Sequence, residues 1–193
     1  MKKRLIAFAC VAMAVMATVT GCGDKSKKAL DKKAIQAEAA VENDIVDDSG
    51  LKLTKCTVGD DTYEITFNMP EGAEEIKKIK GEELTQYTYK KEDVATISID
   101  IDKDEPNPIT PYTPDGLEVR IKDVVKDNLK DLKVEACTNS GISGAKASYG
   151  FLNHFSDRCL EIYSLEDGET NILITVTYLT PEPSYKFDFS IKK

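Results

Sequence analysis

The chain has 193 residues, and its 26 basic and 34 acidic side chains give a formal net charge of −8. This length favours one domain, and the acidic balance excludes nucleic-acid binding driven by bulk electrostatics. Residues 1–21 differ from the rest because they contain three basic residues and no acidic residue. Without them the chain has 172 residues and a net charge of −11, and its apolar residues suffice for one modest core.

Residues 1–21 have the features of a secretory signal peptide. Lys2, Lys3 and Arg4 form a basic start, and an almost uninterrupted apolar run follows. This run of about 15 residues is short for a bilayer-spanning helix, which needs about 20, and it suits the core of a signal peptide. We therefore expect the mature protein to lie outside the cytoplasm.

The end of this segment points to a lipid anchor. Val19, Thr20 and Gly21 precede Cys22, and together they resemble the bacterial lipobox. The resemblance implies that Cys22 receives a diacylglyceryl group and becomes the first residue of the mature chain; the alternative is an ordinary signal peptide with an incidental cysteine. Doubly acylated proteins stay on the membrane. The 23 lysines against three arginines favour a Gram-positive host and its cell surface.

Residues 22–49 are predicted to form a lipidated, flexible tether. They are rich in Ala, Lys, Asp and Glu and poor in large apolar residues, so they cannot bury enough surface to offset the cost of ordering. The basic part, residues 25–33, is expected to lie on anionic lipid headgroups.

Residues 50–193 are predicted to form a single α+β domain. Apolar and polar residues alternate from Tyr63 to Met69 and from Ile97 to Ile101, which is typical of half-buried strands. The segment from Leu84 to Lys90 is a further strand that a polar loop joins to the Ile strand. Five more strands are expected after the middle of the chain: 133–138, 145–152, 158–164, 171–180 and 186–191.

One amphipathic helix is predicted between these two groups of strands. Apolar residues from Leu117 to Leu132 recur at helical spacing, and Thr113 is placed to cap the helix, with Pro114 at its first position. The proline-rich residues 103–114 are expected to be an irregular connection. The order of elements predicts an antiparallel β-sheet with the helix packed on one face.

This order, with the strand Tyr63–Pro70 and a terminal strand before Ser190–Lys193, resembles the Mog1/PsbP-like family of small secreted proteins. The resemblance covers about residues 50–193 and implies a non-enzymatic binding or accessory role. The closing helix usual in that family is hard to place here, because Pro181 and Pro183 occupy part of its position.

Three cysteines remain in the mature chain besides Cys22, namely Cys56, Cys137 and Cys159. Outside the cytoplasm two of them could form a disulfide, and Cys137–Cys159 is the favoured pair. Buried free thiols are the leading alternative, since cysteine often behaves as a small apolar residue. The chain has no Cys-x-x-Cys motif, so neither a zinc site nor a redox site is expected.

Other polar residues give no clear catalytic or metal site. His154 lies in a predicted hairpin loop with Ser156 and Asp157, too close in sequence for a catalytic triad. The spacing of Asp100, Asp102 and Asp104 departs from a calcium loop at the positions of Glu105 and Pro111. We expect Asp100 and Asp102 to lie on the solvent face of a strand, with a weak cation site as the alternative.

Aromatic side chains offer one further candidate surface. Tyr87, Tyr89 and Tyr112 could line a binding surface, but cross-strand packing is the commoner role of alternating aromatic residues.

These observations favour a membrane-anchored binding or accessory module of the cell envelope. Its expected partners are the lipid bilayer, through Cys22, and a small molecule, peptide or envelope protein of unknown identity. No nucleic-acid partner, cofactor, metal ion or catalytic residue is predicted. The alternative is an envelope enzyme that uses carboxylate chemistry, because the histidine and the cysteines are poorly placed for catalysis.

Overall fold

A computed structural model describes residues 45–47, 50–103, 112–153 and 156–193. The predicted signal peptide, Cys22 and residues 22–44 of the predicted tether lie outside the described residues. The same holds for Asp104, most of the proline-rich connection, and His154.

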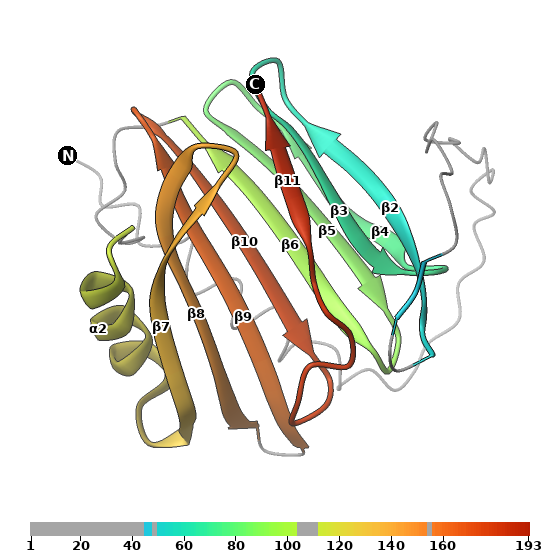
Figure 1. The fold of residues 1–193 in the computed structure, drawn as a ribbon, viewed down its shortest axis with the longest axis vertical. Helices are drawn as coiled ribbons and strands as arrows, with labels where there is room; N and C mark the ends of the chain where they lie inside the picture. Colours follow the sequence, from blue (N-terminus) through green and yellow to red (C-terminus); the bar gives the residue numbers. More distant parts are fainter. Residues whose placement is uncertain (1–44, 48–49, 104–111, 154–155) are drawn as a thin grey trace, which may run out of the picture. The chain divides into compact units, whose positions relative to one another are not determined.

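The strands form two antiparallel sheets (Figure 1). The smaller sheet contains, in spatial order, β1 (Ile45–Val46), β2 (Lys52–Gly59), β3 (Glu64–Pro70) and β11 (Phe189–Lys192). The larger sheet contains, in spatial order, β4 (Glu74–Lys80), β5 (Leu84–Lys91), β6 (Ala95–Asp102), β10 (Thr170–Tyr178), β9 (Ser156–Asp167), β8 (Ile142–Asn153) and β7 (Leu129–Asn139). One helix, α2 (Pro114–Val125), follows β6, and a short 3₁₀ turn, η1 (Lys126–Asn128), joins it to β7. The predicted antiparallel α+β fold is confirmed.

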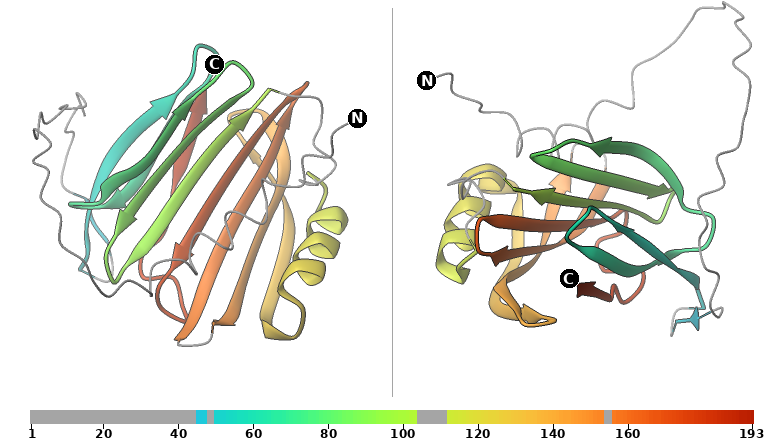
Figure 2. Two further views of the ribbon diagram at one scale, coloured as in Figure 1. Left: turned by 180° about the vertical axis from the view of Figure 1, so that it is seen from behind. Right: turned by 90° about the horizontal axis from the view of Figure 1, so that it is seen from above.

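The two sheets lie in two layers (Figure 2) with the main core between them. We call the side of the seven-stranded sheet that faces the four-stranded sheet its inner face, and the opposite side its outer face. Ile97, Ile99 and Ile101 of β6 are buried on the inner face, against Ile65 and Phe67 of β3. The sequence alternation that predicted half-buried strands arises because successive side chains of a strand point to opposite faces.

A second, smaller core lies on the outer face. Leu117 and Ile121 of α2 are buried against Ala145 and Ala147 of β8 and Ile162 of β9. The alanines leave room for the helix to approach the sheet, and α2 covers β7 and β8 rather than the centre of the sheet (Figure 1).

The predicted start of the helix is confirmed, but its predicted end is wrong. The Thr113 side chain accepts a hydrogen bond from the Gly116 amide, and Pro114 occupies the first turn. The helix ends at Val125, and Leu129 and Leu132 lie in β7. An extra residue in β7 between Lys130 and Lys133 disturbs the pairing with β8.

That irregularity explains the misleading sequence pattern. Leu129 lies opposite Phe151, and after the extra residue Val134 lies opposite Ala147. A bulge of one residue brings side chains three positions apart to the same face of a strand. Leu129 and Leu132 therefore pack on the same core as α2, with a spacing that imitates a helix. Val124 was also assigned to the apolar helix face, but it is 39% exposed.

The C-terminal segment returns to the four-stranded sheet. After β10 no helix follows, and the chain runs through Pro181 and Pro183 to β11, which pairs with β3. The Asn68 side chain bonds the backbone of Lys186 and Asp188. The segment therefore crosses the inner face of the larger sheet at a fixed place, although only β11 pairs with a strand.

The turn between β7 and β8 holds the other side of β11. Asn139 donates from its side-chain amide to the carbonyl of Phe189, and its side-chain oxygen accepts from the Ile191 amide, at 2.8 and 3.2 Å. Ser140 and Gly141 have positive φ angles, which suits a two-residue hairpin turn. The carboxamide thus takes the place of a neighbouring strand along this part of β11.

Candidate ligand-binding groove

A groove of about 850 Å³ lies along the C-terminal segment, between the smaller sheet and Lys146 and Glu161 of the larger sheet. Its walls come from the C-terminal segment 183–190 and from β2 and β3, and part of its lining comes from β8 and β9. This volume is within the usual range of small-molecule sites. The apolar and aromatic lining consists of Leu53, Phe67, Tyr185, Phe187 and Phe189.

Charged side chains line the groove in equal numbers of each sign. The basic ones are Lys55, Lys146 and Lys186, and the acidic ones are Asp47, Glu161 and Asp188. Lys55, Lys186 and Asp188 are exposed, so water screens them. Glu161 and Lys146 are different because their side chains are only 14% and 29% exposed. Their charges therefore dominate the electrostatics of the groove.

The Glu161 carboxylate is the centre of a polar cluster. Its Oε2 atom accepts hydrogen bonds from the hydroxyl groups of Tyr178, at 3.1 Å, and Tyr163, at 3.3 Å. Its Oε1 atom lies 3.7 Å from Nζ of Lys146, which is an ion pair but is too long for a hydrogen bond. The same Nζ lies 5.2 Å from the centre of the Tyr163 ring, within the range of a cation–π contact.

Burial and the carboxylate together keep these tyrosines protonated. Burial raises the pKa of Tyr163 and of Tyr178, and the negative charge of Glu161 raises both further. Burial and then Glu161 also raise the pKa of Tyr185. The Tyr185 side chain is buried, and its hydroxyl oxygen has no hydrogen-bond partner among the described residues. A buried polar group without a partner is costly.

Aromatic rings form the apolar part beside this cluster. The Tyr163 ring meets the Phe189 ring edge-on at 4.9 Å between centroids, and Phe187 lies 5.9 Å from each of them. Such pairs are more stable than their buried area alone implies. The groove therefore combines a charged, hydrogen-bonded centre with rigid aromatic surface.

The favoured disulfide between Cys137 and Cys159 is not formed. Cys56, Cys137 and Cys159 are all free thiols, as the alternative prediction held. Cys137 lies opposite Gly144 and Cys159 lies opposite Gly150, so β8 separates the two cysteines and they are at different heights along it. Burial raises the pKa of each thiol, which keeps the thiols protonated and unreactive at neutral pH.

Asp100 and Asp102 lie on the outer face, opposite the buried isoleucines, as predicted, but both are only partly exposed. Asp100 is on the outer face, where its Oδ1 accepts hydrogen bonds from Gln86 Nε2 at 2.7 Å and Ser98 Oγ at 3.3 Å. Burial raises its pKa to about 6. Its neighbours on β5 and β10 shield it, because β6 is an inner strand of the sheet. Among the described residues, no group of three His, Cys, Asp or Glu side chains could hold a metal ion.

The three tyrosines considered as a binding surface do not form one. Tyr87 and Tyr89 are buried on the inner face, where their hydroxyls donate to the Gly59 carbonyl and to Glu75. Tyr112 lies just before α2 and is partly buried. Tyr87 and Tyr89 therefore have a packing role, the commoner role of alternating aromatic residues.

The residues around the Glu161 carboxylate were not predicted from the sequence. The signal for Glu161 was present, because it interrupts the otherwise apolar series Cys159, Tyr163 and Leu165 at every second position of β9. A charged residue in such a series lies on a buried face. Its contacts with Lys146 and Tyr178 depend on strand order, which the alternation does not contain.

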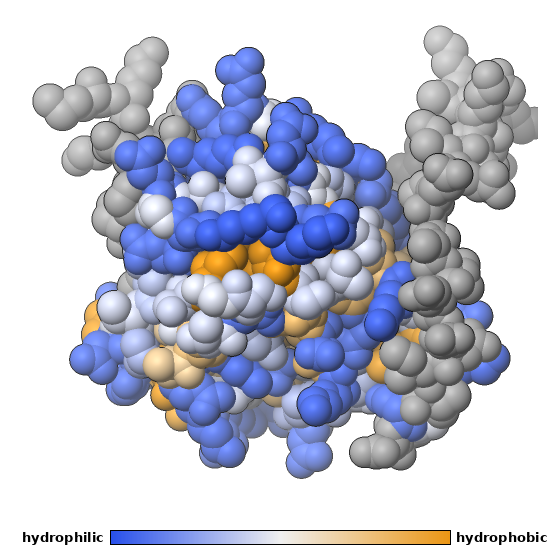
Figure 3. All heavy atoms as spheres, turned by 45° about the horizontal axis from the view of Figure 1, so that its top comes forward, coloured by the Kyte–Doolittle hydropathy of each residue, from blue (hydrophilic) through white to orange (hydrophobic). Residues whose placement is uncertain are grey.

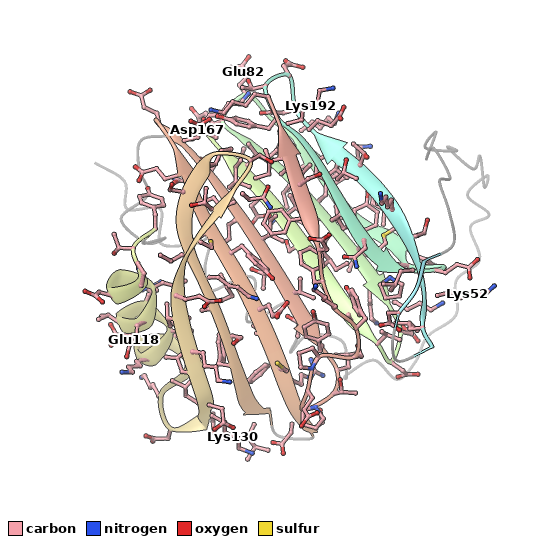
Figure 4. The ribbon with its side chains drawn as sticks, viewed as in Figure 1. Lys52, Glu82, Glu118, Lys130, Asp167 and Lys192 are labelled. Atoms are coloured by element: carbon pink, nitrogen blue, oxygen red, sulfur yellow. The ribbon has the colours of Figure 1, made fainter. Side chains whose placement is uncertain are left out.

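The surface offers few other apolar features. Figure 3 shows a mostly hydrophilic surface with a small hydrophobic patch beneath a hydrophilic ridge, and the large exposed apolar residues are Ile76, Ile79, Val119, Val124 and Leu152. Figure 4 shows the labelled charged side chains around the periphery of the sheets and on α2. In the part of the chain that the structure describes, no helix is long and apolar enough to cross a membrane.

Comparison with known proteins gives no relative. No protein-family model matches the chain, and no curated protein matches its sequence. The resemblance to the Mog1/PsbP-like family stays a prediction, and the groove has to be interpreted from its own geometry.

Proposed function

We propose that this chain is a membrane-anchored binding module on the outside of the cytoplasmic membrane, and that the groove is its binding site. The observation that carries the binding role is the partly buried Lys146–Glu161 pair in an aromatic-lined groove of about 850 Å³. Burying charge is costly unless its partners are well placed, so a fold gains little by keeping this pair for stability alone. Ligand recognition gives the pair a use.

The sequence supports the anchoring part of the proposal. The lipobox-like residues ending at Cys22 supply the attachment point, and about 20 residues separate Cys22 from β1. A flexible linker of this length has a root-mean-square span of roughly 25 Å. The domain would thus be held close to the membrane while keeping freedom to orient the groove toward its ligand.

The anchor is tested by expressing the full chain in a bacterial host with labelled fatty acid. Wild type should carry the label and sediment with membranes, and Cys22→Ala should lose the label and leave the membrane fraction. Undiminished label in Cys22→Ala would refute the anchor.

The groove is tested by filling it. Ser190 is exposed and lines the groove, whereas Val119 on α2 is 60% exposed and does not line it. In a strain that lacks the protein, Ser190→Trp should fail to restore the wild-type phenotype, whereas Val119→Trp should restore it. Full restoration by a folded, normally expressed Ser190→Trp would refute the groove as the functional site.

A further inference from the structure

The Glu161 carboxylate and its surroundings indicate which ligand charge the groove accepts. We propose that the groove binds a ligand ammonium group on an apolar stem, and that Lys146 occupies this position when no ligand is bound. This inference rests on the proposed binding function and specifies its ligand class.

The two oxygens of the Glu161 carboxylate have different partners. Two tyrosine hydroxyls already donate to Oε2, while Oε1 has its cation at 3.7 Å, beyond hydrogen-bonding distance. A carboxylate oxygen in a partly buried place is stabilised most by a charged donor at about 2.8 Å. A ligand ammonium group entering from the groove can approach Oε1 directly, which Lys146 does not do in this structure.

The surroundings of the Lys146 ammonium group include an aromatic ring. Nζ of Lys146 lies over the Tyr163 ring, and an ammonium group is attracted to both a carboxylate and the face of an aromatic ring. The Glu161 carboxylate and the Tyr163 ring therefore both favour a cation at one place.

An anion is a poorer ligand than a cation beside Glu161. The hydroxyl protons of Tyr163 and Tyr178 are directed to Glu161, so neither is available to an anion. An anion beside Lys146 would also lie within a few ångströms of the Glu161 charge, which repels it.

Aromatic surface is available for the rest of the ligand. Phe187 and Phe189 line the groove next to the charged cluster, so an alkyl or aromatic stem can be buried there. Lys146 has a flexible four-carbon stem, and its partial exposure allows its ammonium group to move to water when a ligand displaces it. Both a free amine and a lysine side chain of a peptide have this chemistry.

The test measures the affinity of the purified full-length protein, in detergent, for n-hexylamine and for Nα-acetyl-lysine methylamide, by calorimetric titration at low salt. Hexanoate, which has the same alkyl chain length and opposite charge, is the control ligand. Wild type should bind at least one of the two amines and should not bind hexanoate. Binding of n-hexylamine alone assigns the site to free amines, and binding of the lysine derivative assigns it to a peptide side chain.

Three substitutions should change amine affinity in three different ways. Lys146→Met removes the internal competitor and should tighten amine binding about threefold, the range expected for a partly exposed ion pair. Lys186→Met, which removes an equal charge from the same groove without touching Glu161, should change it much less. Glu161→Gln should weaken binding at least about tenfold.

Several results would overturn the inference. Weaker amine binding by Lys146→Met, equal tightening by Lys186→Met, or no loss in Glu161→Gln would each show that Lys146 does not stand in for the ligand. Binding of hexanoate but not of the amines would overturn the cationic ligand and leave the groove as a binding site. Binding of none of the three probes would also overturn it, whereas the Ser190→Trp experiment decides on the proposed function separately.

Discussion

The inner and outer faces of the seven-stranded sheet both contain a partly buried carboxylate, but its surroundings differ. On the inner face Glu161 has a lysine, two tyrosine donors and an open groove beside it. On the outer face Asp100 has two neutral donors, Gln86 and Ser98, and burial raises its pKa to about 6. Glu161 therefore has an ion-pair partner at 3.7 Å, whereas the charge of Lys77 lowers the pKa of Asp100 less than burial raises it.

The two faces also differ in what covers them. The centre of the inner face is covered by the smaller sheet, while α2 on the outer face contacts β7 and β8. The centre of the outer face has polar residues instead, including Ser98, Thr175 and Thr177. The stability of the fold should therefore depend mainly on the inner face. Substitutions at adjacent positions of β6 should separate the contributions of the two faces to the free energy of unfolding.

The largest expected effect is the loss of stability in Ile99→Ala. Ile99 is fully buried in the main core, and truncating a buried isoleucine costs about 2–5 kcal/mol. Ser98→Ala, at the next position on the outer face, removes the hydrogen bond to Asp100 and should cost less, about 1–2 kcal/mol. Urea unfolding followed by circular dichroism measures both, and equal losses would show that the faces contribute alike.

The second effect has the opposite sign, because Asp100→Asn should stabilise the protein. The folded-state pKa of about 6 exceeds the ordinary value of 3.8, so between about pH 4 and pH 6 the folded state binds more protons than the unfolded state. Stability therefore falls as the pH rises through this range. Asparagine removes the cost of burying a charged carboxylate and keeps an oxygen that accepts from Gln86. Asp100→Asn should therefore raise the free energy of unfolding by roughly 1–2 kcal/mol at pH 7.

Unfolding curves of wild type and Asp100→Asn at pH 4 and pH 7 measure this difference. The gain from the substitution should be small at pH 4 and largest at pH 7. A variant that is less stable than wild type at pH 7 would show that the charged carboxylate is stabilising after all.

A third, smaller effect concerns the wall of the groove. Asn139→Ala removes two hydrogen bonds to β11, but Ser140 Oγ still accepts from the Ile191 amide at 3.3 Å, so the net loss should be about 1 kcal/mol. Amide hydrogen exchange should become faster in Phe189–Lys192 and remain unchanged in β6. Unchanged exchange in β11 would show that pairing with β3 and the Ser140 hydrogen bond together hold the strand.

The smallest effect is expected at the edge of the sheets, where Lys193 pairs with Asp167 at 2.6 Å. The hydrogen bonds from Lys193 and Tyr63 lower the pKa of Asp167. Their contribution to the stability of the folded state is therefore present above about pH 4 and is lost as the pH falls. Lys193→Ala should lower the melting temperature slightly at pH 7 and not at pH 2. An equal change at both pH values would assign the effect to packing.

The sequence allowed prediction of the elements better than of their arrangement. The alternation around Ile99 and the cap at Thr113 have local causes, so the strand and the start of the helix were correctly predicted. The exposed strand β4 was missed because its residues, Glu74–Lys80, show no alternation of burial. The end of the helix was wrong because a bulge in β7 gives Leu129 and Leu132 a helical spacing.

The groove depends on long-range pairing, which explains why its residues were not predicted. Glu161 and Tyr178 meet because β9 and β10 are neighbours, and Lys146 joins them from β8. Tyr185 reaches the same place through the C-terminal segment, whose course is held by the Asn68 and Asn139 side chains. Neither contact leaves a periodic signal in the sequence.

The most direct test of the account exchanges a carboxylate for an amide on each face and measures function in cells. Glu161→Gln and Asp100→Asn are the same chemical change, on the inner and outer faces of one sheet. In a strain that lacks the protein, Asp100→Asn should restore the wild-type phenotype fully and Glu161→Gln should fail, with both variants expressed at the wild-type level. Full restoration by Glu161→Gln, or failure of Asp100→Asn, would contradict the assignment of function to the groove.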